Sequence, residues 1–198
     1  MTEGPRHLRA SDYRAMRWAN GLGVTTELAR EPQEGDRYRW RISIATVDSD
    51  GPFSAFPGYD RIITMLKGDG MKLSFGEAHA PVTVARALEP FPFSGDWQTD
   101  CRLLGGIVTD FNVISDRAMG RSNVTVLREA GISRPCPMRG GAQFIYVAQG
   151  KLTCRSGETE TLVMEGESLL RRRGQGDLSV EVGAGGGALV IDLELPPA

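Results

Sequence analysis

The sequence of 198 residues is poor in metal-binding side chains, with only two histidines, His7 and His79, and three cysteines. Histidine is the commonest metal ligand in proteins, and these two lie far apart in polar segments, where we expect them to face solvent. The cysteines have neither the number nor the spacing of a disulfide framework or a zinc motif. We therefore expect no bound metal, no other cofactor and no metal-dependent oxygen chemistry.

An excess of charge of either sign is also missing, because 23 lysines and arginines stand against 25 acidic residues. Such a balance favours neither nucleic acid nor an anionic membrane as a partner. No stretch reaches the roughly 18 apolar residues of a membrane-spanning helix, and the first twenty residues or so lack the apolar segment of a secretory signal. We expect a cytoplasmic protein. The basic run at residues 171–173 is predicted to be a solvated strand end.

Strong helical periodicity is absent, and short strand patterns between glycine-bearing turns take its place. Trp40–Val47 alternates, with Trp40, Ile42 and Ile44 on one face and Arg41 and Ser43 on the other. An apolar run at residues 62–66, a turn with two glycines and a second strand pattern at 71–75 predict a β-hairpin. Residues 12–18 are the best candidate for a short helix.

The hairpin pattern returns over residues 143–155, as strand, glycine turn and strand. Arg61 precedes the turn glycine Gly68 by seven residues, and Gln143 precedes Gly150 by the same seven. The repetition predicts two similar β-units.

Many short strands with few helices indicate an all-β sandwich or barrel. With a repeat joined near residues 115–125, we expect an N-terminal half at residues 1–120 and a C-terminal half at 121–198. The two halves are expected to pack as one compact unit, with the ligand pocket in the first.

A turn rich in glycine, proline and aromatic residues, residues 51–61, ends in Arg61 at the start of an apolar strand. A guanidinium is planar and permanently charged, and its forked donors match a carboxylate. Burying this charge at the inner end of a strand costs free energy unless an acidic side chain or a bound anion pairs with it. Arg61 is therefore the first candidate for binding an acidic small molecule. Phe53 and Ser54 would be pocket residues beside it.

Structural alternatives remain open for this segment. Arg61 could pair with Asp60, Asp69 or Glu27, and the turn phenylalanines could simply close the end of a barrel. Glu27 could instead pair with Arg41, orient an arginine or act as an acid or base.

The run at residues 21–26, Gly-Leu-Gly-Val-Thr-Thr, lacks the preceding apolar strand and the third glycine of a dinucleotide fingerprint. If a strand follows, Thr25 shares a face with Glu27, and both side chains can reach one pocket. The hydroxyls of Thr25 and Thr26 could equally satisfy the turn backbone.

A third polar cluster contains Asp110, Asn112 and Arg117. Asn112 can donate and accept hydrogen bonds, and Arg117 offers a second cation, so two arginines would suit a dicarboxylate. The same segment could instead be the connector between the two units.

Five segments in this order resemble the HutD/Ves family of bicupin-like proteins, namely residues 18–27, 39–45, 51–61, 92–95 and 110–117. The resemblance is weaker in the C-terminal half. It implies two cupin-type β-barrels in one chain and a link to bacterial histidine breakdown. Members are thought to govern that pathway rather than catalyse a step, with N-formylglutamate or urocanate as the suspected ligand.

We therefore predict a non-catalytic protein that binds a small carboxylate and regulates histidine utilisation. Its ligand-binding residues are predicted to be Arg61, Asn20, Thr25, Thr26, Glu27, Ser54, Phe53, Asn112 and Arg117. The alternative is a metal-independent cupin-type isomerase or hydrolase with Glu27 or Asp110 as general base. A protein-interaction scaffold is a third hypothesis. The sequence leaves a homodimer open.

Overall fold

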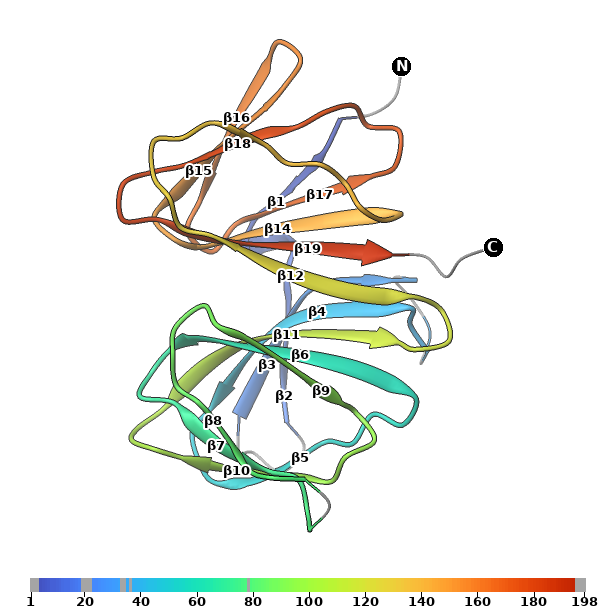
Figure 1. Cartoon of the computed structure of the whole chain (residues 1–198), viewed down its shortest axis with the longest axis vertical. Helices are drawn as coiled ribbons and strands as arrows, with labels where there is room; N and C mark the ends of the chain where they lie inside the picture. The colour runs from blue at the N-terminus through green and yellow to red at the C-terminus, as the bar shows by residue number, and fades with distance from the viewer. Residues whose placement is uncertain (1–3, 19–22, 33–34, 36, 78, 195–198) are drawn as a thin grey trace. The chain divides into compact units, whose positions relative to one another are not determined.

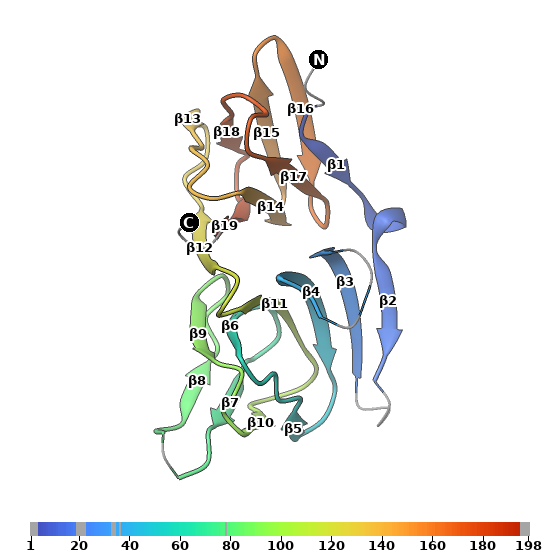
Figure 2. The same cartoon turned by 90° about the vertical axis from the view of Figure 1, so that its right-hand side faces the viewer.

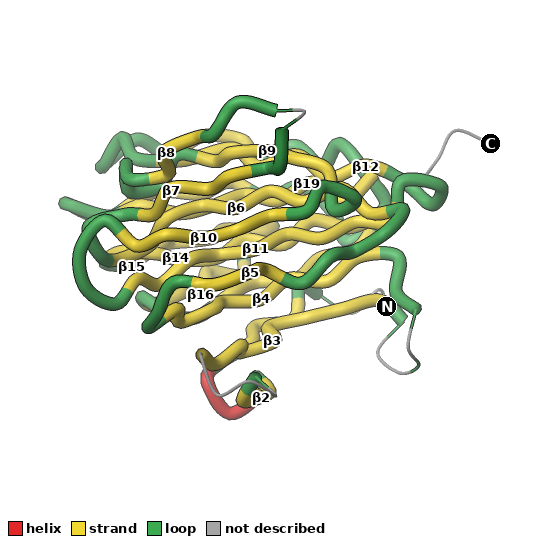
Figure 3. The backbone as a smooth tube through the Cα atoms, turned by 90° about the horizontal axis from the view of Figure 1, so that it is seen from below, coloured by secondary structure: helices red, strands yellow, loops and turns green. Residues whose placement is uncertain are grey.

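The computed structural model describes residues 4–18, 23–32, 35, 37–77 and 79–194, and β-strands make up most of them (Figure 1). Within these ranges, the helical structure is a 3-10 turn, η1 (Ala10–Asp12), drawn red in Figure 3. The expectation of a short helix over residues 12–18 is wrong. Arg14–Arg17 form strand β2, because their backbone pairs antiparallel with β3 (Gly23–Glu31). In the described ranges no helix has the length and apolar character needed to span a membrane.

Two compact units share the chain, and the all-β fold predicted from the sequence is confirmed. One unit contains residues 13–121. The other contains residues 122–194 together with residues 4–12. The early segment joins this unit because strand β1 (Arg6–Leu8) pairs antiparallel with β17 (Ser168–Arg172).

The unit of residues 13–121 consists of two antiparallel sheets (Figure 2). The larger sheet has the order β2-β3-β4-β11-β6-β9, in which β4 is Trp40–Val47, β11 Val108–Asp116, β6 Tyr59–Lys67 and β9 Pro90–Ser94. The smaller sheet has the order β5-β10-β7-β8, with bounds Gly51–Phe53, Thr99–Leu103, Met71–Ser74 and Val82–Val84. Apolar side chains from both sheets form one core, including Ile63 and Met65 of β6 and Met71 and Leu73 of β7.

The other unit repeats this plan with a sheet of order β1-β17-β14-β19-β12 and a sheet of order β13-β18-β15-β16. The remaining bounds of the first sheet are Ala142–Gln149 for β14, Gly187–Glu194 for β19 and Arg121–Leu127 for β12. Those of the second are Arg134–Pro135 for β13, Ser179–Val182 for β18, Lys151–Ser156 for β15 and Thr159–Met164 for β16. Ile145, Leu152 and Val180 are among the residues of its core.

Neither predicted hairpin exists as a pair of hydrogen-bonded strands. β6 and β7 follow one another across a glycine turn, yet β6 pairs with β11 and β9 while β7 pairs with β10 and β8. β14 and β15 likewise belong to different sheets. The reason is that both strands of each predicted hairpin carry apolar side chains that are buried between two sheets. Each glycine turn is therefore a corner between sheets.

The corner at Gly68 is sterically tighter than the one at Gly150. Both glycines have positive φ, 106° and 68°. A Cβ at Gly68 would lie 2.7 Å from the carbonyl oxygen of Ile107, whereas the nearest atom to a Cβ at Gly150 is 3.3 Å away. Since only glycine combines this backbone conformation with such a close approach, Gly68 fixes the corner that leads out of β6.

We predict that Gly68→Ala lowers the free energy of unfolding by more than about 2 kcal/mol, because left-handed strain adds to backbone overlap. Gly157→Ala is the matched control, since its φ is 56° and a Cβ there would meet no atom within 4 Å. Gly157→Ala should lower the free energy of unfolding by only about 1 kcal/mol, which is the cost of the left-handed backbone strain alone. Urea denaturation of both variants measures the difference. Equal losses would show that the close approach at Gly68 is unimportant.

Candidate functional site

A cavity of about 410 Å³ lies in the unit of residues 13–121. Alternate residues of β4 and β11 form its floor, including Arg41 and Ser43 on β4 and Asp110 and Asn112 on β11. Arg61 of β6 lines it beside them. Successive side chains of a strand point to opposite faces, so the alternation recognised in Trp40–Val47 is real. Its polar face, not its apolar one, lines the cavity.

Arg61 is 6% exposed, and its guanidinium is held by neutral acceptors. Its Nη2 donates to Asn112 Oδ1 at 3.1 Å, and its Nη1 donates to the backbone oxygen of Ser54 at 3.4 Å. No described residue accepts a hydrogen bond from its buried Nε. Burial lowers the pKa of Arg61 to about 10, although the negative charge of Asp110 raises it. The group is therefore a desolvated cation at neutral pH.

Aromatic rings surround this cation. The guanidinium carbon lies 4.8 Å from the ring centre of Phe93, 5.1 Å from that of Phe56 and 5.6 Å from that of Phe53. Each contact is within the range of a cation–π interaction, which is stronger where water is excluded. Of the two alternatives for Phe53 and Phe56, the structure agrees with the pocket wall. The rings line the cavity and contact the arginine.

Asp110 is the acidic residue that interacts electrostatically with Arg61, and Asn112 bridges the two side chains. Asn112 accepts from Arg61 with its oxygen and donates with Nδ2 to Asp110 Oδ1. Asp110 is only 1% exposed, and no described residue offers a hydrogen bond to its Oδ2. Burial raises the pKa of Asp110 to about 7, against the opposing effects of Arg61 and Asn112. This carboxyl group can therefore change its charge near neutral pH.

A second arginine of the cavity, Arg41, is already paired. Its Nε donates to Glu27 Oε2 at 2.7 Å, and both side chains are largely buried. Of the two arginines considered as partners of Glu27, the structure selects Arg41. Glu27 does not line the cavity itself, but it fixes the guanidinium that does.

Thr25 lines the cavity at the end where β3 begins. Its hydroxyl accepts a hydrogen bond of 2.7 Å from Trp18 Nε1, and Trp18 lines the cavity too. Gly23 allows this arrangement, because a Cβ there would lie 2.5 Å from the backbone oxygen of Thr46 and 3.2 Å from the Trp18 ring. Thr26 sits at the adjacent position opposite Ile44 and does not line the cavity. Asn20 lies outside the described residues.

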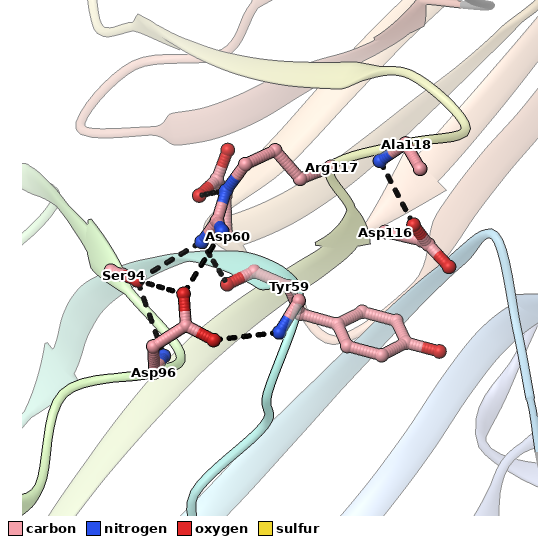
Figure 4. Close-up of polar contacts among 8 residues, drawn as sticks. Tyr59, Asp60, Ser94, Asp96, Asp116, Arg117 and Ala118 are labelled. Atoms are coloured by element: carbon pink, nitrogen blue, oxygen red, sulfur yellow. Dashed lines mark hydrogen bonds and ion pairs between the residues drawn. The ribbon is translucent and has the colours of Figure 1, made fainter.

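Arg117 is placed in a surface cluster rather than in the cavity (Figure 4). Its guanidinium makes ion pairs of 2.8 Å with Asp60 and 2.9 Å with Asp96, and it also donates to the hydroxyl of Ser94. All three charged side chains are more than 40% exposed. The two acids balance its charge, so this cluster ties the end of β11 to neighbouring segments.

The other unit has its own buried polar cluster, which is closed. Gln143 donates to Asp192 at 2.7 Å and accepts from Arg171 Nε at 2.9 Å. Arg171 also donates to the backbone oxygens of Cys136 and Gly176. The expectation that residues 171–173 form a solvated strand end is wrong for Arg171, which is 2% exposed because Gln143 and these carbonyls bind it. These hydrogen bonds connect β14, β17 and β19 within the unit.

The described part of the chain has no group of three or more side chains suited to hold a metal ion. His7 is half-buried and contacts Glu167 at 2.8 Å, so the expectation that it faces solvent freely is wrong. His79 is exposed and stacks on Trp97 at 3.8 Å between ring centres.

Reasoning from the sequence did not place several side chains at the site. Arg41 and Trp18 line the cavity, and Phe93 stacks on Arg61 without lining it. Phe56 was weighed as a pocket wall and Asp110 as part of a polar cluster or as a catalytic base, but neither was included among the predicted ligand-binding residues. Arg41 could have been found from the alternation of its strand, which carries polar residues on one face. The stacking of Phe93 on Arg61 had no sequence signal. It arises because β9 pairs with β6 and sets Phe93 opposite Arg61.

Paired antiparallel sheets with a cavity on the inner face of one unit define an all-β protein of the cupin type. A cupin barrel-domain protein from Leptotrichia buccalis shares this fold, with a TM-score of 0.57 and 12% identity over 91% of this chain and 96% of its own. More specifically, the chain belongs to the HutD family, whose model matches residues 10–190.

Two solved structures and one sequence relative with higher identity to this chain agree with the assignment to the HutD family. A conserved protein of unknown function from Pseudomonas aeruginosa is 32% identical, with a TM-score of 0.86 over 97% of this chain and 100% of its own. HutD from Pseudomonas fluorescens, in its structure for the formate condition, is 27% identical, with a TM-score of 0.80 over 96% of this chain and 100% of its own. An uncharacterised 21.2 kDa protein in the hutC 3' region of Pseudomonas putida is 49% identical over 109 residues. That match spans 54% of this chain and 56% of the relative.

We predict that Asp110→Asn stabilises the protein at pH 8 but not at pH 4. Because the pKa of Asp110 is raised from 3.8 to about 7, the folded state binds more protons than the unfolded state between these values. Its contribution to stability is therefore full below about pH 4 and is lost as the pH rises to about 7. Asparagine mimics the protonated group and should recover on the order of 2 kcal/mol at pH 8.

Urea denaturation between pH 4 and pH 8 measures this effect. Asp100→Asn is the matched control, since it removes the same charge from an exposed position on β10. If wild type and Asp110→Asn show the same pH dependence, Asp110 does not titrate in this range.

Proposed function

We propose that this protein binds a small carboxylic acid in the cavity around Arg61, without catalysing a reaction, and regulates histidine utilisation. The observation that carries the proposal is the desolvated guanidinium of Arg61. It lines a cavity of about 410 Å³, and the described groups in direct hydrogen-bond contact with it are neutral. A buried cation held by neutral acceptors attracts an anion of fitting size.

The cavity suits an acid with a small organic body. Phe53 and Phe56 supply apolar surface beside the arginine, while Thr25 and Ser43 supply hydroxyl groups. A mixture of aromatic walls and a few convergent polar groups is typical of small-molecule sites. N-formylglutamate and urocanate, the ligands suggested by the family resemblance, both combine a carboxylate with further polar atoms.

A dicarboxylate would meet its second cation inside the same cavity. Arg41 lines the cavity with Arg61, although Glu27 offsets part of its charge. Arg117, the partner first considered, is held by two acids of a surface cluster. We therefore favour Arg61 and Arg41 as the cationic pair for N-formylglutamate.

The regulatory part of the proposal is supported by two relatives. The P. fluorescens protein is named HutD, and the P. putida relative is an uncharacterised protein in the hutC 3' region. Both names connect the family to the hut genes. A binder of a pathway intermediate in that setting would report how much of the intermediate has accumulated.

We predict that Arg61→Ala weakens binding of N-formylglutamate at least tenfold. A buried charge-assisted hydrogen bond contributes about 1.5–3 kcal/mol, and about 1.4 kcal/mol corresponds to tenfold in affinity. Isothermal titration calorimetry at pH 6.5 measures the affinity, and urocanate and formate are titrated in parallel. Arg117→Ala is the control, because it removes an arginine that lies outside the cavity.

Binding that is unchanged in Arg61→Ala but lost in Arg117→Ala would move the ligand site to the surface cluster. Failure of the wild type to bind any of the three acids would refute the carboxylate-binding function.

One observation favours the competing hypothesis of a metal-independent enzyme. A carboxyl group with its pKa raised to about 7 in a cavity is suited to general acid–base catalysis, and Asp110 is such a group. Its orphaned Oδ2 is buried, however, and the described cavity lining contains neither histidine nor cysteine as a nucleophile.

We expect no turnover when N-formylglutamate or urocanate is incubated with the protein. Mass spectrometry of the mixture over hours checks this, with Asp110→Asn as the reference. Product formation by the wild type that Asp110→Asn abolishes would establish an enzyme in place of a binder.

A further inference from the structure

The proposed function leaves one feature of the cavity unexplained, which is the carboxyl group of Asp110 close to Arg61. It would be a second carboxylate beside that of the ligand. Asp110 and Arg61 both line the cavity, and Asn112 bridges them by accepting from one and donating to the other. In the absence of ligand, Asp110 is the acid linked to Arg61 through this bridge. A ligand carboxylate that binds Arg61 therefore competes with an internal one.

Two carboxylates and one guanidinium in a desolvated space carry an excess negative charge. Like charges in such a site favour protonation of one of the two acids. The acid with the less favourable surroundings takes the proton. Asp110 is 1% exposed, and its Oδ2 lacks a partner among the described residues, whereas a ligand carboxylate would gain the charge of Arg61.

We propose that ligand binding is coupled to the uptake of one proton by Asp110, so that the ligand carboxylate replaces it as the counter-charge of Arg61. This inference rests on the proposed function and adds its regulation by pH. The proton comes from solvent and bonds to Oδ2, the oxygen that the hydrogen bond from Asn112 leaves free. The proton offsets the negative charge of the one ligand carboxylate that binds Arg61.

Among the described residues, the other titratable groups near Asp110 either have a pKa raised well above neutrality or are held in an ion pair. The groups that face it from neighbouring elements, or act on its partners, are Arg61 on β6, Arg41 on β4, Glu27 on β3, Cys101 on β10 and Tyr38 before β4. Burial raises the pKa of Cys101 to about 12 and raises that of Tyr38 above its usual value of 10. Arg41 and Glu27 neutralise each other as an ion pair. The pKa of Asp110, about 7, lies in the relevant range.

Calorimetry with N-formylglutamate tests the proposal, because both of its carboxylates stay ionised above about pH 5. Titrations are run at pH 5.5, 7 and 8.5, each in a buffer of low and a buffer of high ionisation enthalpy. The difference in heat gives the number of protons taken up. We expect nearly none at pH 5.5, about one per ligand at pH 8.5, and an affinity that falls about tenfold per pH unit above pH 7.

Asp110→Asn keeps the shape of the side chain in its neutral form. This variant should bind at pH 8.5 about as tightly as the wild type binds at pH 5.5, with no proton uptake. Asp100→Asn, which removes an exposed acid of β10, should retain the behaviour of the wild type. If Asp110→Asn does not fold, the wild-type titrations in paired buffers decide alone.

The outcomes separate this inference from the proposed function. Binding by the wild type with constant affinity and no proton uptake from pH 5.5 to 8.5 would overturn the coupling and leave the carboxylate site standing. Proton uptake that persists in Asp110→Asn would also overturn it, since another group would then titrate. Absence of binding at every pH would refute both.

Discussion

The buried guanidinium of Arg61 is the group on which the arrangement of the cavity depends. A permanent charge removed from water must be compensated, and this protein compensates it with many weak contacts instead of one ion pair. Asn112, the backbone of Ser54 and three aromatic rings surround it. Asp110 acts on it through Asn112. These contacts hold the cation in place, and no ion pair with a described residue neutralises it directly.

The two units share one sheet arrangement but differ in their buried polar groups, which are hydrogen-bonded to one another in one unit and border a cavity in the other. Arg61 and Gln143 both stand seven residues before a corner glycine, and both are buried on long strands. Around Gln143, the polar groups of Asp192 and Arg171 are satisfied within the protein. Around Arg61 they are not, because two buried polar atoms lack partners among the described residues and a cavity adjoins them. Unsatisfied buried groups are costly, which is why they mark the unit that carries the candidate site.

Part of the cavity lining could be predicted because side-chain chemistry and position beside a turn are local properties. Arg61, Phe53, Ser54, Thr25 and Asn112 were named from the sequence and line one cavity. The family assignment to HutD and the all-β fold were also confirmed. The roles of Arg41 and Phe93 were missed, since they depend on which strands become neighbours. Arg117 was linked to the site by its charge type, a property that says nothing about which acids surround it.

The sequence by itself determined the strands on either side of the two glycine turns, the turns themselves and the presence of an arginine where an apolar strand begins, because these follow from backbone sterics and from a periodicity of two. Only the tertiary structure decided that the turns join different sheets and that Asn112 bridges Asp110 and Arg61. It also decided that Arg171 is internal and Arg117 external. Sheet pairing between residues distant in the chain determines these neighbours. Burial then determines which charged side chains need partners inside the protein.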